Sequence, residues 1–106
     1  MAELAQITDR VTASVGAESG LDAVIKFVFP ETGILLIDGR TIPNRVTNED
    51  GASDITITLK LDNFEKILDQ KLNPKIALMT GRMRLRGDIR IAMRLDKVFG
   101  LPPSMA

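Results

Sequence analysis

The side chains that most often carry out acid–base and nucleophilic chemistry are missing from this 106-residue sequence, which has no His, Cys, Tyr or Trp. Imidazole is the usual proton donor and acceptor near neutral pH, and thiolate is the strongest side-chain nucleophile. Most Ser-His, Cys-His and zinc arrangements are therefore closed to this chain. A carboxylate or a lysine could still catalyse, but we expect a protein that is not an enzyme and has no catalytic residues, metal site or cofactor.

Arginines are the strongest remaining candidates for a binding site. Five of them lie close together in the last third of the chain: Arg82, Arg84, Arg86, Arg90 and Arg94. They could contact phosphates, but no aromatic residue that could stack on bases accompanies them, so we expect no nucleic acid partner. For Arg82, Arg84 and Arg86 two interpretations stay open, a solvated strand face and a transient contact with an anionic membrane.

The charge distribution shows the same asymmetry. The net charge is zero, but residues 1–72 hold 7 basic and 12 acidic side chains, a balance of −5, and residues 73–106 hold 7 and 2, a balance of +5. The acidic run at 48–51 lacks the ligand spacing of a calcium loop. The asymmetry indicates a surface property and does not define the fold.

Targeting signals and membrane spans are not evident in the sequence. No apolar run approaches the roughly 18–20 residues of a membrane helix. The first ten residues lack the apolar core of a signal peptide, and the chain ends Pro-Ser-Met-Ala, without a peroxisomal tail. Because the sequence also lacks cysteine, we expect a cytoplasmic protein.

The elements that must position these groups follow from the spacing of apolar residues. Alternation predicts strands over residues 23–29, 33–38, 41–47, 55–60 and 82–86, and helical spacing predicts helices over 4–15, from 62 onward, over 73–81 and over 88–99. We place the third strand at a sheet edge, because Pro43 cannot donate a backbone hydrogen bond. Asp62 and Glu65 predict a capping box, and Asn73 and Asp88 predict caps of the two later helices.

These elements predict a two-layer α+β sandwich in a single domain over residues 1–106, because all apolar strand faces must point toward the helices. The side chains that we expect between the two layers share an apolar position on an inner face. The strands contribute Ile25, Phe27, Ile55, Ile57, Leu59, Met83 and Leu85, and the helices contribute Phe64, Leu68, Leu72, Ile76, Met79, Ile89 and Met93. From periodicity alone, the same residues could simply fill a core.

The last predicted helix is more apolar than packing on a sheet requires. At 100° per residue its apolar side chains cover roughly 220° of the circumference, whereas a surface helix needs little more than about 100°. Arg90, Arg94 and Lys97 form its polar stripe. The surplus apolar surface must contact a ligand, a partner chain or another part of the core.

Two segments, SDITITLKLDNFEKIL over 53–68 and LNPKIALMTGRMRLRGDIRIAMRL over 72–95, resemble the sterol carrier protein two family of lipid-binding domains. The match runs from about residue 23 to 99. The positions that carry the resemblance are Asp54, Thr56, Phe64, Asn73-Pro74, Ala77-Leu78-Met79, Gly81, Gly87-Asp88 and Ala92-Met93. Ser53 and Leu78 stand where the family commonly has Ala and Phe.

The resemblance implies a five-stranded, mainly antiparallel sheet with helices on one face around an apolar tunnel. We therefore expect the chain to bind sterol-like molecules, fatty acids or acyl-CoA, and to be able to transfer them, with the fourteen inner-face residues above as its lipid-binding residues. Such a carrier needs a cavity of roughly 300–1,000 Å³. The alternative is an interaction or dimerisation module that uses the last helix, which needs a filled core and an exposed apolar patch. The native lipid, the oligomeric state and any partner enzyme stay open.

Overall fold

A five-stranded sheet forms one layer of the protein, in the order β3-β2-β1-β4-β5. The computed structural model describes residues 3–100, so residues 1–2 and 101–106, on which the expectations about targeting signals partly depend, lie outside the described residues. The strands are β1 (Val24–Phe29), β2 (Gly33–Asp38), β3 (Arg45–Thr47), β4 (Ile55–Leu59) and β5 (Met83–Gly87). β1 and β4 pair in parallel, and the other neighbouring pairs are antiparallel, which confirms the mainly antiparallel sheet.

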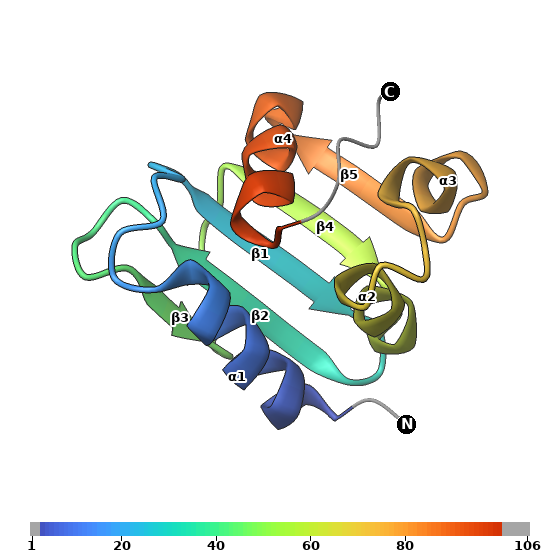
Figure 1. The fold of residues 1–106 in the computed structure, drawn as a ribbon, viewed down its shortest axis with the longest axis horizontal. Coiled ribbons are helices and arrows are strands. Elements are labelled where there is room, and N and C mark those ends of the chain that lie inside the picture. The colour runs from blue at the N-terminus through green and yellow to red at the C-terminus, as the bar shows by residue number, and fades with distance from the viewer. Residues whose placement is uncertain (1–2, 101–106) are drawn as a thin grey trace.

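The second layer consists of helices on one face of this sheet (Figure 1). Within the described residues they are α1 (Leu4–Val15), α2 (Leu61–Leu68), α3 (Pro74–Met79) and α4 (Ile89–Val98). α1 covers the β2–β3 side, α4 crosses the β1–β4 centre, and α3 lies beside β5. The predicted two-layer α+β fold is confirmed, and no helix among residues 3–100 is long and apolar enough to cross a membrane.

Strand alternation decides which side chains enter the core between the layers. In β1, Ile25 and Phe27 are buried while Lys26 is only half-buried, and β4 repeats the pattern. The core also takes the buried stripe of each long helix: Ile7, Val11 and Val15 from α1, Phe64 and Ile67 from α2, and Ile91 and Leu95 from α4. Each such side chain stabilises the fold by about 1.5–3 kcal/mol relative to an exposed one.

Two local predictions need correction. α2 begins at Leu61, not at Asp62, and its N-cap residue Lys60 makes no side-chain capping bond, so the predicted capping box is wrong. The chain enters α2 one residue after β4 ends, which lets Leu61 reach the core, and Asp62 then falls in the first turn, where a negative charge favours the helix. β3 is an edge strand as expected but shorter than predicted, because Asn44 accepts hydrogen bonds from the backbone and hydroxyl of Ser19 instead of joining the strand.

The caps predicted for the two later helices are confirmed. The Asn73 side chain accepts a hydrogen bond from the Lys75 N–H at 2.8 Å and opens α3 with Pro74 at its first position. The Asp88 carboxylate accepts one from the Arg90 N–H at 3.1 Å and opens α4. These caps set where α3 and α4 start on either side of β5, and so fix the space between them.

Candidate functional site

An apolar cavity of about 180 Å³ lies among the sheet and helices α2, α3 and α4. Fifteen residues line it: Phe27, Ile57, Phe64, Ile67, Pro74, Lys75, Leu78, Met83, Leu85, Ile89, Ala92, Met93, Leu95, Asp96 and Phe99. All of these except Lys75 and Asp96 are apolar. The volume is more than ten times the roughly 10–15 Å³ that one water needs, but the walls offer water few partners. The cavity is therefore suited to hydrocarbon.

The four phenylalanines explain why this space is not filled by side chains. Their rings gather beside α2, where the Phe64 ring centre lies 4.7 Å from that of Phe27, 5.4 Å from that of Phe29 and 5.9 Å from that of Phe99. Such distances are typical of packed aromatic pairs. The four aromatic rings are thus gathered beside α2, and mainly Met and aliphatic side chains line the rest of the cavity.

The cavity is open to solvent between α3 and α4. Three of its lining side chains are strongly exposed, Leu78 at 43%, Ile89 at 61% and Met93 at 64%. Its volume is below the roughly 300–1,000 Å³ of pockets that enclose a whole ligand. A long ligand would bury one part in the cavity and leave the other part between the two helices.

The two charged lining residues sit on opposite helices, Lys75 on α3 and Asp96 on α4. Within the described residues, neither side chain has a hydrogen-bond or ion-pair partner. Partial burial raises the pKa of the Asp96 carboxyl above its usual value. An ammonium and a carboxyl group are therefore both free to contact the polar end of a ligand.

The structure brings together half of the fourteen side chains expected at the ligand. The lining includes Phe27, Ile57, Phe64, Met83, Leu85, Ile89 and Met93. The other seven do not line the cavity: Ile25, Ile55, Leu59 and Leu72 are buried in the core, Leu68 is half-buried against it, and Ile76 and Met79 are exposed on α3. Alternation identifies the inner face of a strand, but the cavity extends under only part of that face.

Eight lining residues were not anticipated as ligand contacts: Ile67, Pro74, Lys75, Leu78, Ala92, Leu95, Asp96 and Phe99. Pro74, Leu78 and Ala92 belong to the motifs of the family resemblance, and Leu95 and Phe99 to the wide apolar arc of the last helix, so a signal for them existed. Nothing in the sequence separates Lys75 and Asp96 from ordinary solvated charges.

The wide apolar arc of α4 serves two surfaces. Ile91 and Leu95 are buried at 4% exposure each, and Leu95 forms part of the cavity wall together with Ile89, Ala92 and Met93. The surplus apolar surface predicted for this helix therefore faces the cavity and its opening.

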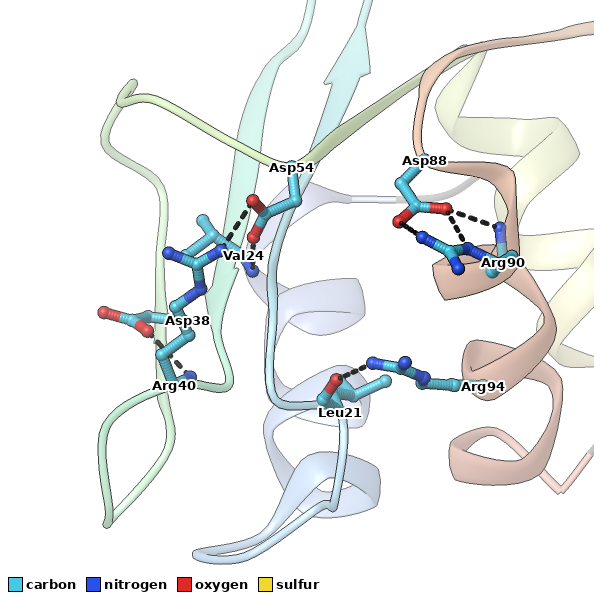
Figure 2. A network of polar contacts seen from close by, with 8 residues as sticks. All are labelled: Leu21, Val24, Asp38, Arg40, Asp54, Asp88, Arg90 and Arg94. Carbon is cyan, nitrogen blue, oxygen red and sulfur yellow. Dashed lines mark hydrogen bonds and ion pairs between the residues drawn. The ribbon is translucent and has the colours of Figure 1, made fainter.

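The opposite flank of α4 carries a polar network (Figure 2). The Asp54 carboxylate accepts a hydrogen bond from the Val24 N–H at 2.8 Å and pairs with the Arg40 guanidinium at 2.7 Å. The Arg94 guanidinium donates to the Leu21 carbonyl at 2.8 Å. Asp88 pairs with Arg90 at the start of the helix. Of these bonds, the one from Arg94 fastens α4 to the loop before β1.

A second hollow, of about 240 Å³, lies along this network. It is lined by Asp22, Ala23, Arg40, Asp54, Asp88, Ile91 and Arg94. Although it is larger than the apolar cavity, most of its charged groups already bond to one another or to backbone, so a ligand would have to replace those bonds. We assign it a structural role.

Gly87 shows what some residues of the family resemblance do. Its φ is +119°, and a Cβ atom there would lie 2.3 Å from the Asp54 carbonyl oxygen, so the position requires glycine. The same oxygen accepts a hydrogen bond from the Asp88 N–H at 3.1 Å. Asp54, Gly87 and Asp88 thus join the start of β4 to the start of α4 and lie outside the cavity lining.

The basic strand face is present, but it points away from the cavity. Arg84 and Arg86 pair with Thr58 and Thr56 on the sheet surface that carries no helix in the described residues. Met83 and Leu85 point the other way and line the cavity. Among residues 3–100, no group of three or more acidic side chains is placed to hold a metal ion.

A single sheet covered on one face by helices, with an open apolar cavity between the layers, is an arrangement suited to binding hydrocarbon. The chain matches the model of the SCP-2 sterol transfer family over residues 8–100, so it belongs to that family. The resemblance inferred from the sequence is confirmed. Family and fold together support lipid binding by this chain.

Individual relatives agree with this assignment. Over 46 residues the chain is 33% identical to the mouse protein hydroxysteroid dehydrogenase-like protein 2, a match that covers 43% of this chain and 9% of that protein. The chain thus spans only a small part of that relative.

Among solved structures, the sterol carrier protein domain 2 of Helicoverpa armigera superposes with a TM-score of 0.72, at 20% identity over 90% of this chain and 84% of that one. The Aedes aegypti sterol carrier protein-2 in complex with palmitate superposes with a TM-score of 0.65, at 18% identity over 87% and 93% of the two chains. At such identities these likenesses show the fold.

Proposed function

We propose that the chain binds one amphiphilic lipid, such as a fatty acid, an acyl-CoA or a sterol-like molecule, in the cavity between the sheet, α3 and α4, and transfers it between membranes. The observation that carries the proposal is an open apolar cavity with two unpaired charged side chains in its lining. Each methylene that leaves water contributes about 0.8 kcal/mol, so about ten buried methylenes contribute about 8 kcal/mol before ordering costs. Affinity that comes from burying hydrocarbon is large, but it discriminates little between one lipid and another.

The two charged lining residues give the ligand an orientation. The Lys75 ammonium attracts a carboxylate or phosphate head group, and the Asp96 carboxyl can accept a hydrogen bond from a hydroxyl group. The hydrocarbon part then points toward the phenylalanine cluster around Phe64. The palmitate complex of the Aedes aegypti protein, which has the same fold, supports an acyl ligand.

Attraction to an anionic membrane is part of the proposal. Arg82, Arg84 and Arg86 are exposed, and each basic group near such a surface contributes up to about 1 kcal/mol. This attraction acts over about 10 Å at 0.1 M salt, so it does not require that the basic strand face touches the bilayer.

The proposed function is tested by titrating delipidated protein with a fluorescent fatty acid. We expect saturation at about one molecule per chain and displacement by unlabelled fatty acid or sterol. Absence of saturation across fatty acids, acyl-CoA and sterols would refute lipid binding. Native mass spectrometry of protein purified from its host, followed by extraction, identifies the natural lipid.

The second candidate function is an interaction or dimerisation module. It is favoured by the exposed apolar side chains Ile89 and Met93 on α4. It predicts a concentration-dependent dimer or a bound partner chain, with no saturable lipid site.

A further inference from the structure

Strongly exposed apolar side chains are concentrated around the opening of the cavity. In residues 3–100, five of the six exposed large apolar side chains lie on α3 and α4: Ile76 at 51%, Leu78 at 43%, Met79 at 76%, Ile89 at 61% and Met93 at 64%. We call these five residues the apolar rim. The sixth, Ile42, is 71% exposed in the loop before β3 and is remote from it in the sequence.

The apolar rim is wider than the cavity it surrounds. Leu78, Ile89 and Met93 line the cavity, but Ile76 and Met79 do not. Both sit on α3, where Ala77 is the buried residue that faces the protein. Large clustered apolar patches on soluble proteins usually mark a surface of interaction. Ile76 and Met79 therefore need an explanation that a ligand inside the cavity does not supply.

Charge restricts which partner fits the apolar rim. Basic residues accompany it on its own helices, Lys75 on α3 and Lys97 on α4, and Asp96 is the one acidic residue in the cavity lining. A second copy of the chain docked rim to rim would bring two such basic regions together, which opposes dimer formation. An anionic surface that also accepts apolar side chains is complementary.

We propose that the apolar rim is the surface by which this chain docks on an anionic phospholipid bilayer, with α3 and α4 entering the interface so that the cavity opens toward the acyl chains. Binding at a bilayer interface combines buried apolar area with attraction between basic side chains and anionic lipids, and the rim supplies both. The inference rests on the proposed function in one respect, because the lipid that passes through the opening is the cavity ligand.

Docking by the apolar rim differs in orientation from contact by the basic strand face. Arg84 and Arg86 lie on the sheet surface opposite the helices, and the rim lies on the helices themselves. A bilayer bound flat against Arg84 and Arg86 would leave the cavity open to water. Substitutions in the rim and in the strand can therefore be distinguished by their effects.

The experiment compares Met79→Glu and Ile76→Glu with Ile42→Glu as the matched control. All three replace an exposed apolar side chain by a carboxylate, and none of the three lines the cavity. Flotation with vesicles of phosphatidylcholine and phosphatidylserine measures docking, and transfer of a fluorescent fatty acid between such vesicles measures delivery. We expect Met79→Glu and Ile76→Glu each to weaken docking and slow transfer about tenfold, because the inserted apolar area is lost. Ile42→Glu should change neither.

Two further measurements separate the outcomes. Thermal melting monitored by circular dichroism checks that each variant folds. If Met79→Glu does not fold, Ile76→Glu alone is compared with the control Ile42→Glu. Docking that is equal in all three variants and the unsubstituted chain overturns the inference, as does a dimer in analytical ultracentrifugation that Met79→Glu dissociates. If the fluorescent fatty acid never saturates in solution but docking depends on the rim, the proposed function fails while the docking surface stands.

Discussion

On one flank of α4, Ile89, Ala92 and Met93 border an apolar cavity that no side chain fills. On the other flank, Arg94 donates a hydrogen bond to the Leu21 carbonyl, and Asp88 accepts one from Arg90. One flank of this helix borders an apolar cavity, and the other borders a polar hollow in which most charged groups are already hydrogen-bonded, although both belong to the same three turns of chain.

The difference shows how a small domain can keep a cavity without collapsing into it. α4 is held by the bond from Arg94 to the Leu21 carbonyl, by the backbone bond from Asp88 to the Asp54 carbonyl and by the buried side chain of Ile91, none of which lies in the cavity lining. Closing the cavity would require α4 to move away from those bonds. Substitutions on the two flanks should therefore change different quantities: stability on the held side and lipid affinity on the open side.

The largest expected effect is that of Gly87→Ala, on the held side. The new Cβ atom would meet the Asp54 carbonyl oxygen at 2.3 Å in a backbone conformation with φ of +119°, so the junction between β4 and α4 must shift. We expect a loss of about 4 kcal/mol in the free energy of unfolding, combining backbone strain and overpacking. Urea unfolding measures it.

Gly81→Ala is the matched control for this prediction. Gly81 also has a positive φ, +77°, but nothing lies within 4 Å of the added Cβ atom. It should cost only about 1 kcal/mol, the cost of the left-handed conformation alone. Equal losses at the two glycines would show that the contact with Asp54 does not hold α4.

The next effect compares two isoleucines two positions apart on α4. Ile91 is 4% exposed in the core, and Ile89 is 61% exposed at the cavity. Ile91→Ala should lower the free energy of unfolding by about 3 kcal/mol, as expected for a buried isoleucine. Ile89→Ala should cost about 0.5 kcal/mol or less, but weaken the binding of a fatty acid. Calorimetric melting measures the loss of stability, and fluorescence titration measures the fatty-acid affinity. Equal losses of stability in the two variants would show that the two flanks of α4 do not differ in this way.

Ile89 and Ile91 also show how much of the structure can be predicted from the sequence. Periodicity predicts that Ile89 and Ile91 are both apolar positions of one helix, and the strong alternation in β1 and β4 predicts the sheet and its inner face. What separates core from cavity is the placement of α3 and α4 on either side of β5, which depends on long-range contacts. That is why Phe27 and Ile57 line the cavity while Ile25 and Ile55, equally apolar and on the same face, are core.

The missed residues have a similar physical cause. Lys75 and Asp96 differ from other exposed charges only through the apolar space beside them, and a single sequence does not show that space. The sequence predicts that α2 starts at Asp62 because Asp62 fits a capping position locally, whereas burial of Leu61 moves the helix start one residue earlier. In both cases tertiary packing overrides a local pattern.

A third test of the difference between the two flanks of α4 is to fill the cavity. Ala92→Phe places a ring in the space that Ala92 borders, so the ligand-free protein should be as stable as before or slightly more stable, while affinity for a fatty acid falls about tenfold or more. Met93 is a poorer site, because it is 64% exposed and a larger ring could turn into solvent. The melting temperature of delipidated protein should hold or rise, while the fatty-acid affinity measured by titration should fall. A large loss of stability with unchanged affinity would place Ala92 in a filled core.

The smallest expected effect concerns two carboxyl groups, one on each flank, whose pKa values move in opposite directions. The hydrogen bond from the Arg90 guanidinium lowers the pKa of Asp88, and partial burial beside the cavity raises that of Asp96, both from a usual value of 3.8. A lowered folded-state pKa adds stability that is present above 3.8 and lost as the pH falls through the lowered value. A raised one adds stability that is present below 3.8 and lost as the pH rises through the raised value.

The variants Asp88→Asn and Asp96→Asn should therefore diverge at pH 7, and the differences of both from the unsubstituted chain should shrink as the pH falls below 3.8. At pH 7 the neutral amide removes the favourable pairing with Arg90 in Asp88→Asn, which should be less stable than the unsubstituted chain. In Asp96→Asn it removes an unpaired, partly buried charge, so this variant should be slightly more stable and bind a fatty acid carboxylate more tightly. Urea midpoints and fatty-acid titrations at pH 3, 5 and 7 measure both. If Asp96→Asn loses stability at pH 7 to the same extent as Asp88→Asn, Asp96 is held by a partner, and the cavity flank is not the open side of α4.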